Sequence, residues 1–62
     1  MDKIIKIAKF YNAEITVHSN TAVIHYPVLG QGSAMSGDIE ELFDAVRIKM
    51  IPSERKLEVE LL

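Results

Sequence analysis

Cysteine and tryptophan are absent from this chain of 62 residues, and glycine and proline are scarce, with three and two residues. Without cysteine, neither a disulfide nor a thiolate-bound metal can stabilise the fold. A domain of this size seldom builds a core large enough to be very stable alone. We therefore expect the monomer to be only marginally stable. Self-association would add stability by burying more apolar surface.

Long apolar runs and a strong charge of one sign are missing as well. No apolar stretch approaches the roughly 18 residues of a membrane-spanning helix. The first six residues mix charged and apolar side chains, unlike a signal peptide. The net charge is −2, and hydrophobic and charged residues make up 48% and 26% of the chain. This balance predicts one globular, cytoplasmic domain over residues 1–62 with no membrane span.

Apolar side chains recur with helical spacing at the start of the chain. Four of them follow the i, i+3, i+4, i+7 pattern of one helix face: Ile4, Ile7, Ala8 and Tyr11. Asp2 precedes them as a candidate N-cap. The pattern predicts a helix over about residues 2–11. Its opposite side carries a basic stripe, which consists of Lys3, Lys6 and Lys9.

Residues 13–26 alternate polar and apolar side chains on either side of Ser19-Asn20, which predicts a hairpin with a two-residue turn. This turn pairs Ile15 with Ile24 and collects the apolar residues on one side of the ribbon. A slip of one residue would mix the two sides, so the agreement supports the register.

The segment after the hairpin contains all three glycines and few apolar residues. We expect a flexible loop over about residues 29–37. Asp38 and Glu41 have the spacing of a capping box, so a second helix is expected to begin at Asp38. The apolar face of this helix would consist of Ile39, Leu42, Phe43 and Val46.

Two interpretations fit the chain from Val46 to Met50: the second helix continues, or a strand begins. We favour a strand that pairs with residues 56–61 across a turn at residues 52–55. One register then pairs Ile48 with Val59 and opposes Lys49 to Glu58. The same register adds three pairs: Met50 with Leu57, Val46 with Leu61, and Arg47 with Glu60. The expected fold is α+β in the order αββ–αββ, a four-stranded, mostly antiparallel sheet with both helices on one face.

No catalytic or metal site can be assembled from the sequence. His18 and His25 are about four residues apart along the ribbon, or roughly 13 Å, which is too far to share a metal ion. The glycine-containing segment lacks the lysine of a phosphate-binding loop. If that segment bound an anion, the donors would be Gly32, Ser33, Ser36 and Gly37. We therefore expect no enzymatic activity and no cofactor.

Surplus apolar residues favour a binding role. Five of them do not fit the faces assigned to the core: Ile5, Phe10, Val23, Ile51 and Leu62. Exposed apolar clusters often mark interfaces. The sequence therefore predicts a protein–protein interaction module, a homo-oligomer and most simply a dimer, that acts as a regulator, inhibitor or assembly factor. The residues expected to contact a partner are Asp38, Glu40, Glu41, Asp44, Phe10, Val23 and Ile51.

An alternative interpretation is an accessory domain that binds nucleic acid through basic side chains. Those side chains would be Lys3, Lys6, Lys9, Arg47, Lys49, Arg55 and Lys56. A third and weaker interpretation is peripheral attachment to a membrane through the basic stripe of residues 2–11.

Overall fold

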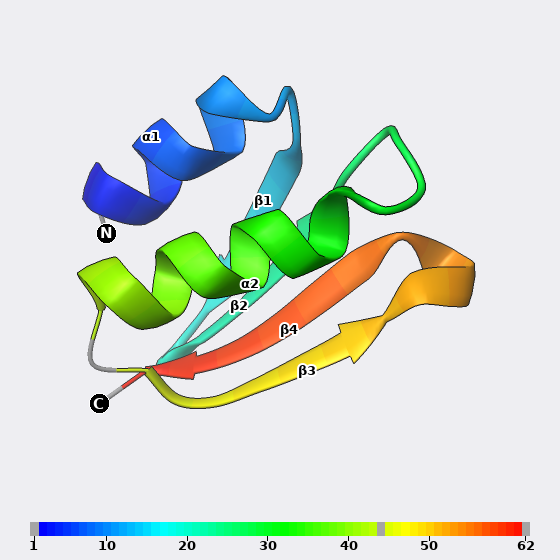
Figure 1. The fold of residues 1–62 in the computed structure, drawn as a ribbon. Coiled ribbons are helices and arrows are strands. Elements are labelled where there is room, and N and C mark those ends of the chain that lie inside the picture. Colours follow the sequence, from blue (N-terminus) through cyan, green and yellow to red (C-terminus); the bar gives the residue numbers. More distant parts are fainter. Residues whose placement is uncertain (1, 44, 62) are drawn as a thin grey trace.

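The computed structural model describes residues 2–43 and 45–61. The elements in chain order are α1 (Asp2–Phe10), β1 (Glu14–His18), β2 (Thr21–His25), α2 (Gln31–Leu42), β3 (Ala45–Ile51), the short 3-10 helix η1 (Pro52–Glu54) and β4 (Lys56–Leu61). The strands form one antiparallel sheet in the order β1-β2-β4-β3. Both helices cover the same face of this sheet (Figure 1). The predicted α+β fold and its αββαββ order are confirmed.

The core lies between the two helices and the sheet. α1 contacts β1, and α2 contacts β3 and β4. Alternate residues of the two central strands face the helices and are fully buried, namely Ala22, Ile24, Leu57 and Val59. The helices bury Ile4, Ile7, Ala8, Met35 and Ile39 against them. The opposite face of the sheet has no layer over it among the described residues.

α1 ends in a Schellman motif. Asn12 adopts a left-handed conformation with φ 58°. The N–H of Ala13 donates to the carbonyl of Ala8 at 2.7 Å, and the N–H of Asn12 donates to that of Lys9 at 3.1 Å. These two bonds satisfy carbonyls that the helix end leaves without partners. They also turn the chain directly into β1, so the helix and the edge strand are joined by a short, defined connection.

The first hairpin has the predicted register. Ile15 pairs with Ile24, and Thr16 pairs with Val23. The two-residue turn contains Ser19, which has a positive φ of 60°. The apolar residues of β2 on the helix-facing side are buried, as the alternation indicated.

The second ribbon is also a hairpin, so the strand interpretation of residues 46–51 is correct. Ile48 pairs with Val59 and Lys49 with Glu58, as predicted. One predicted pair is wrong: Leu61 lies opposite Ala45 and not Val46, because the register shifts between Ala45 and Arg47. A bulge of this kind leaves one residue of the strand without a cross-strand partner.

The expected flexible loop over residues 29–37 is wrong, because α2 begins at Gln31 and Asp38 lies well inside it. Gly30 occupies the N-cap with φ 100°, a conformation that favours glycine, and provides no side-chain cap. Gly32 is buried, and an added Cβ there would collide with the ring of Tyr26 and approach the Met50 sulfur. The helix start therefore packs closely on the sheet where the sequence indicated open loop.

Several apolar residues assigned to the core are in fact exposed. The set is Val17, Leu42, Val46 and Met50. Three of them lie on β1 and β3, which are the edge strands and have a neighbour on one side only. The fourth, Leu42, is the last residue of α2. The other large exposed apolar residues among those described lie on α1 and between β2 and α2, namely Ile5, Phe10, Val28 and Leu29.

Candidate functional site

A groove runs between α1 and α2, with a volume of about 170 Å³. From α1 its lining includes Lys3, Lys6 and Phe10, which fall on one flank of the helix because they follow i, i+3, i+7 spacing. From α2 it includes Asp38 and Leu42, one turn apart. The interhelical groove is mainly apolar, and the two lysines stand at its α1 side.

Phe10 is the most exposed large apolar residue of the described chain, with 81% of its surface accessible. Its ring meets that of Tyr11 edge to face, with centroids 5.0 Å apart and planes at 85°. The Phe10 ring therefore contacts Tyr11 on one side and is otherwise open to solvent. An aromatic side chain held in this way contributes contact area without the loss of much conformational freedom on binding.

A hydrogen bond closes the groove at the end of α1. The Tyr11 hydroxyl donates to Asp38 Oδ2 at 2.6 Å, and the pair is partly buried. This hydrogen bond raises the pKa of Tyr11 above its ordinary value of 10.0, and desolvation and the negative charge of Asp38 act in the same direction. The bond joins the two helices across 27 positions of sequence. It also engages the single acidic side chain of the groove lining.

Asp38→Ala should lower the pKa of Tyr11 towards its ordinary value, because the hydrogen-bond acceptor and its charge are both removed. The raised pKa means that the bond stabilises the fold fully below pH 10 and that this stabilisation is lost as pH rises through the higher, folded-state value. Titration of Cζ-labelled tyrosine by NMR gives the pKa directly. Glu40→Ala, which removes an exposed acid of the same helix, is the control and should leave the Tyr11 titration unchanged.

The acidic residues predicted to contact a partner, namely Asp38, Glu40, Glu41 and Asp44, do not share the same surroundings. Glu40 and Glu41 are exposed on α2, whereas Asp38 is half-buried and bonded to Tyr11. Asp44 lies outside the described residues. α2 contains no lysine or arginine, so its exposed side carries negative charge only. Of these acids only Asp38 lines the interhelical groove, and Glu40 and Glu41 lie outside its lining.

The predicted apolar contact residues do not form one patch. Phe10 lies in the interhelical groove. Val23 and Ile51 are half-buried and lie on the opposite, outer face of the sheet, since their neighbours in the ladders, Thr16 and Lys56, point away from the helices. Sequence reasoning had missed Leu42 and Tyr11 as groove residues, having placed both in the core. A tyrosine on an apolar helix face was a usable signal, because its hydroxyl requires a partner.

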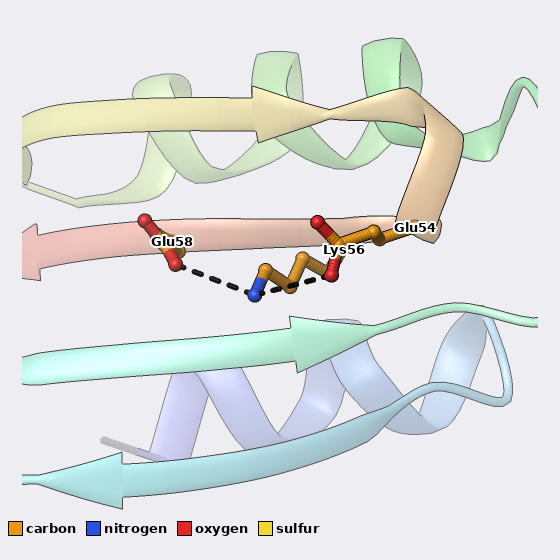
Figure 2. A network of polar contacts seen from close by, with 3 residues as sticks. All are labelled: Glu54, Lys56 and Glu58. Atoms are coloured by element: carbon orange, nitrogen blue, oxygen red, sulfur yellow. Dashed lines mark ion pairs between the residues drawn. The ribbon is translucent and has the colours of Figure 1, made fainter.

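The outer face of the sheet carries charges of both signs. Lys56 Nζ lies 3.6 Å from Glu54 Oε1 and 3.5 Å from Glu58 Oε2 (Figure 2). The predicted cross-strand neighbours Lys49–Glu58 and Arg47–Glu60 are confirmed as register partners. The Lys56 side chain is 20% accessible and its partners Glu54 and Glu58 are 62% and 36% accessible, so solvent reaches both pairs and they contribute little to stability. Their main effect is to balance the charge of this face.

The seven basic residues proposed for nucleic-acid binding do not share a surface. Lys3 and Lys6 line the interhelical groove, whereas Lys9 is exposed outside that lining. Arg47, Lys49 and Lys56 lie on the outer face of the sheet beside glutamates, and Arg55 ends η1 with φ 50°. The seven basic side chains are thus divided between α1, the outer face of the sheet and η1 and do not form one cluster.

The residues considered for metal or anion binding are not grouped into a site either. His25 pairs with Glu14 at one end of the first hairpin, and His18 pairs with Thr21 at the other. Within residues 2–43 and 45–61, no three His, Asp or Glu side chains are grouped so that they could hold a metal ion. Gly32, proposed as an anion donor, is buried against Tyr26 inside the helix start.

None of the helices in the described part of the chain is both long and apolar enough to cross a membrane. Comparison with protein families, with characterised proteins and with solved structures found no family model, no protein and no structure that matches this chain.

Proposed function

We propose that this protein is a non-enzymatic protein–protein interaction module of the regulator, inhibitor or assembly-factor kind. Its interhelical groove binds one large apolar side chain of a partner segment that also carries acidic residues. The observation that carries the proposal is the exposed ring of Phe10, which lies one turn after Lys6 and two turns after Lys3 on the flank of α1 that lines an apolar groove.

The size of the groove favours a protein partner over a small molecule. Its volume of about 170 Å³ is below the roughly 300–1,000 Å³ of typical small-molecule sites. A space of this size suits a single anchoring side chain, with the surrounding helix surfaces providing the rest of the contact. Such anchors, with aromatic residues prominent among them, dominate the binding energy of protein interfaces.

The charge of the lining favours an acidic partner. Two lysines face one carboxylate, and that carboxylate already accepts the hydrogen bond from Tyr11. The ammonium groups of Lys3 and Lys6 are therefore available to acidic groups on a partner, while their alkyl chains extend the apolar wall. Charged groups at a rim of this kind govern partner choice and association rate more than affinity.

Selection of a displayed peptide library on the immobilised protein tests the proposal. We expect enriched peptides to combine a large apolar residue with neighbouring Asp or Glu, and Phe10→Ala to weaken their binding about 30-fold, as for a hot-spot aromatic. Leu42→Ala should also weaken binding, whereas Leu29→Ala, an exposed leucine outside the groove, should not. Enriched peptides that bind Phe10→Ala as well as the original chain would contradict the proposal.

Charge reversal provides an independent readout on the same peptides. Lys6→Glu should reduce the affinity for acidic peptides and the salt dependence of binding, because Lys6 lines the groove. Lys9→Glu changes the net charge equally but lies outside the lining, so it should have a smaller effect. Equal losses in the two variants would indicate a diffuse attraction instead of a groove.

A further inference from the structure

The two edges of the sheet differ in how they are protected. β3 carries a bulge near Ala45 and Arg47, presents two basic side chains, and is followed by Pro52. Bulges, charges and proline are the devices that prevent an edge strand from pairing with another chain. β1 has an unbroken register along all five of its residues and no lysine, arginine or proline. The β1 edge is therefore open to further pairing.

The sequence of β1 is complementary to itself in the antiparallel direction. The strand reads Glu14-Ile15-Thr16-Val17-His18. If two copies pair around Thr16, Ile15 lies opposite Val17 of the second copy, and Glu14 lies opposite its His18. Apolar residues then face apolar residues, an acid faces a histidine at each end, and threonine faces threonine. Cross-strand pairs of these types stabilise a sheet.

The backbone of β1 supports the same register. In a two-residue hairpin the residues flanking the turn form a hydrogen-bonded pair, and such pairs alternate along the ladder. Thr16 therefore directs its backbone groups towards β2, and Ile15 and Val17 direct theirs to the open edge. Pairing around Thr16 places the outward N–H and C=O groups of Ile15 opposite those of the second copy's Val17.

Apolar surface next to this edge would be covered by the pairing. Val17 is 42% exposed on the helix-facing side of β1. α1 lies over β1, and its Ile5, on the flank away from the interhelical groove, is 39% exposed. With rises of about 1.5 Å per helix residue and 3.3 Å per strand residue, Ile5 stands level with Thr16 and Val17. Two α1 helices would meet above the paired strands.

We infer that two copies of this chain associate edge to edge through β1, around a two-fold axis at Thr16, to form a continuous eight-stranded sheet. The interaction is isologous, with the same residues contributed by both copies. It leaves the interhelical groove accessible, because that groove lies on the flank of α1 that faces α2, and α2 covers the other half of the sheet. Self-association and the proposed partner binding are thus separate properties of separate surfaces.

Charge substitution at the symmetry axis tests this arrangement by sedimentation equilibrium. Thr16 is exposed on the outer face of the sheet, so Thr16→Lys and Thr16→Glu leave the core intact. The wild-type chain should sediment at twice 7.0 kDa, and each variant alone should sediment as a monomer because like charges oppose each other. An equimolar mixture of the two variants should recover the dimer mass. Thr21→Lys, on the inner strand β2, is the control and should remain dimeric.

Disulfide trapping provides a second measurement that does not depend on those variants. The chain contains no cysteine, and residues in a non-hydrogen-bonded antiparallel pair have Cα atoms about 4.5 Å apart, within the range of a disulfide. Oxidised Thr16→Cys should become a covalent dimer quickly, and Thr21→Cys should not. A monomeric wild-type chain at millimolar concentration would overturn the inference. So would a dimer that Thr16→Lys leaves intact and Thr16→Cys fails to trap.

Discussion

Leu57→Ala is expected to leave a large part of the protein unfolded at room temperature. Leu57 lies in β4, between Ile24 of β2 and Met50 of β3, and none of its surface is accessible to solvent. Truncation of a buried leucine to alanine costs about 3–5 kcal/mol, because apolar contact is lost and a cavity remains. A core of this size seldom supplies more than about 3–5 kcal/mol of stability in total. This one substitution therefore removes most of the free energy of unfolding.

The matched control is Leu29→Ala, the same chemical change at a residue that is 69% exposed in the segment between β2 and α2. We expect it to alter the free energy of unfolding by less than about 0.5 kcal/mol. Urea unfolding followed by circular dichroism compares the three proteins. Similar midpoints for Leu57→Ala and Leu29→Ala would mean that β4 is not at the centre of the core.

Gly32→Ala is expected to destabilise the protein, although alanine is the better helix former. The added methyl group would overlap the hydroxyl end of the Tyr26 ring, and that ring is itself buried in the core. Forcing an extra carbon into a packed site costs about 1–3 kcal/mol. The higher helix propensity of alanine relative to glycine stabilises the fold by at most about 1 kcal/mol. The net effect is a loss of stability, visible as a lower urea midpoint.

Gly37→Ala in the same helix should have the opposite sign. A Cβ at Gly37 meets nothing within 4 Å, and the residue is exposed. Only the propensity difference then acts, and it stabilises the helix by about 0.5–1 kcal/mol. The two glycine variants differ only in their surroundings, so a shared sign would show that α2 does not pack on Tyr26 in solution.

Both hairpins could be predicted from local alternation, because side chains in a strand change face at every residue. The pairs Ile15–Ile24 and Ile48–Val59 follow from turn position alone. The bulge beside Arg47 could not be predicted in this way. It depends on how β3 approaches the end of β4, which no nearby residue determines.

The start of α2 was missed because its stability is not local. Residues 30–37 are rich in glycine and serine, which are poor helix formers, and Gly30 offers no side-chain cap. What holds this turn is the burial of Gly32 and Met35 against the sheet. Tertiary packing commonly overrides intrinsic propensity in this manner. The i, i+4 spacing of Met35 and Ile39 was the available signal.

The interhelical groove was only half predictable. The exposure of Phe10 and the basic stripe of α1 follow from periodicity within one helix. The bond between Tyr11 and Asp38 joins residues 27 positions apart. This bond forms only because α1 and α2 lie side by side. That arrangement depends on the beginning of α2 at Gln31, which the sequence did not predict.

The strand order has a consequence for synthesis of the chain. β4 is the last of the four strands in sequence, yet it lies between β2 and β3 and is hydrogen-bonded to both. While residues 56–61 are still inside the ribosome, the first hairpin and β3 have no backbone bonds to each other. The emerging chain therefore keeps the β2 edge of its first hairpin unpaired and its helix faces exposed until β4 leaves the ribosome and inserts between β2 and β3.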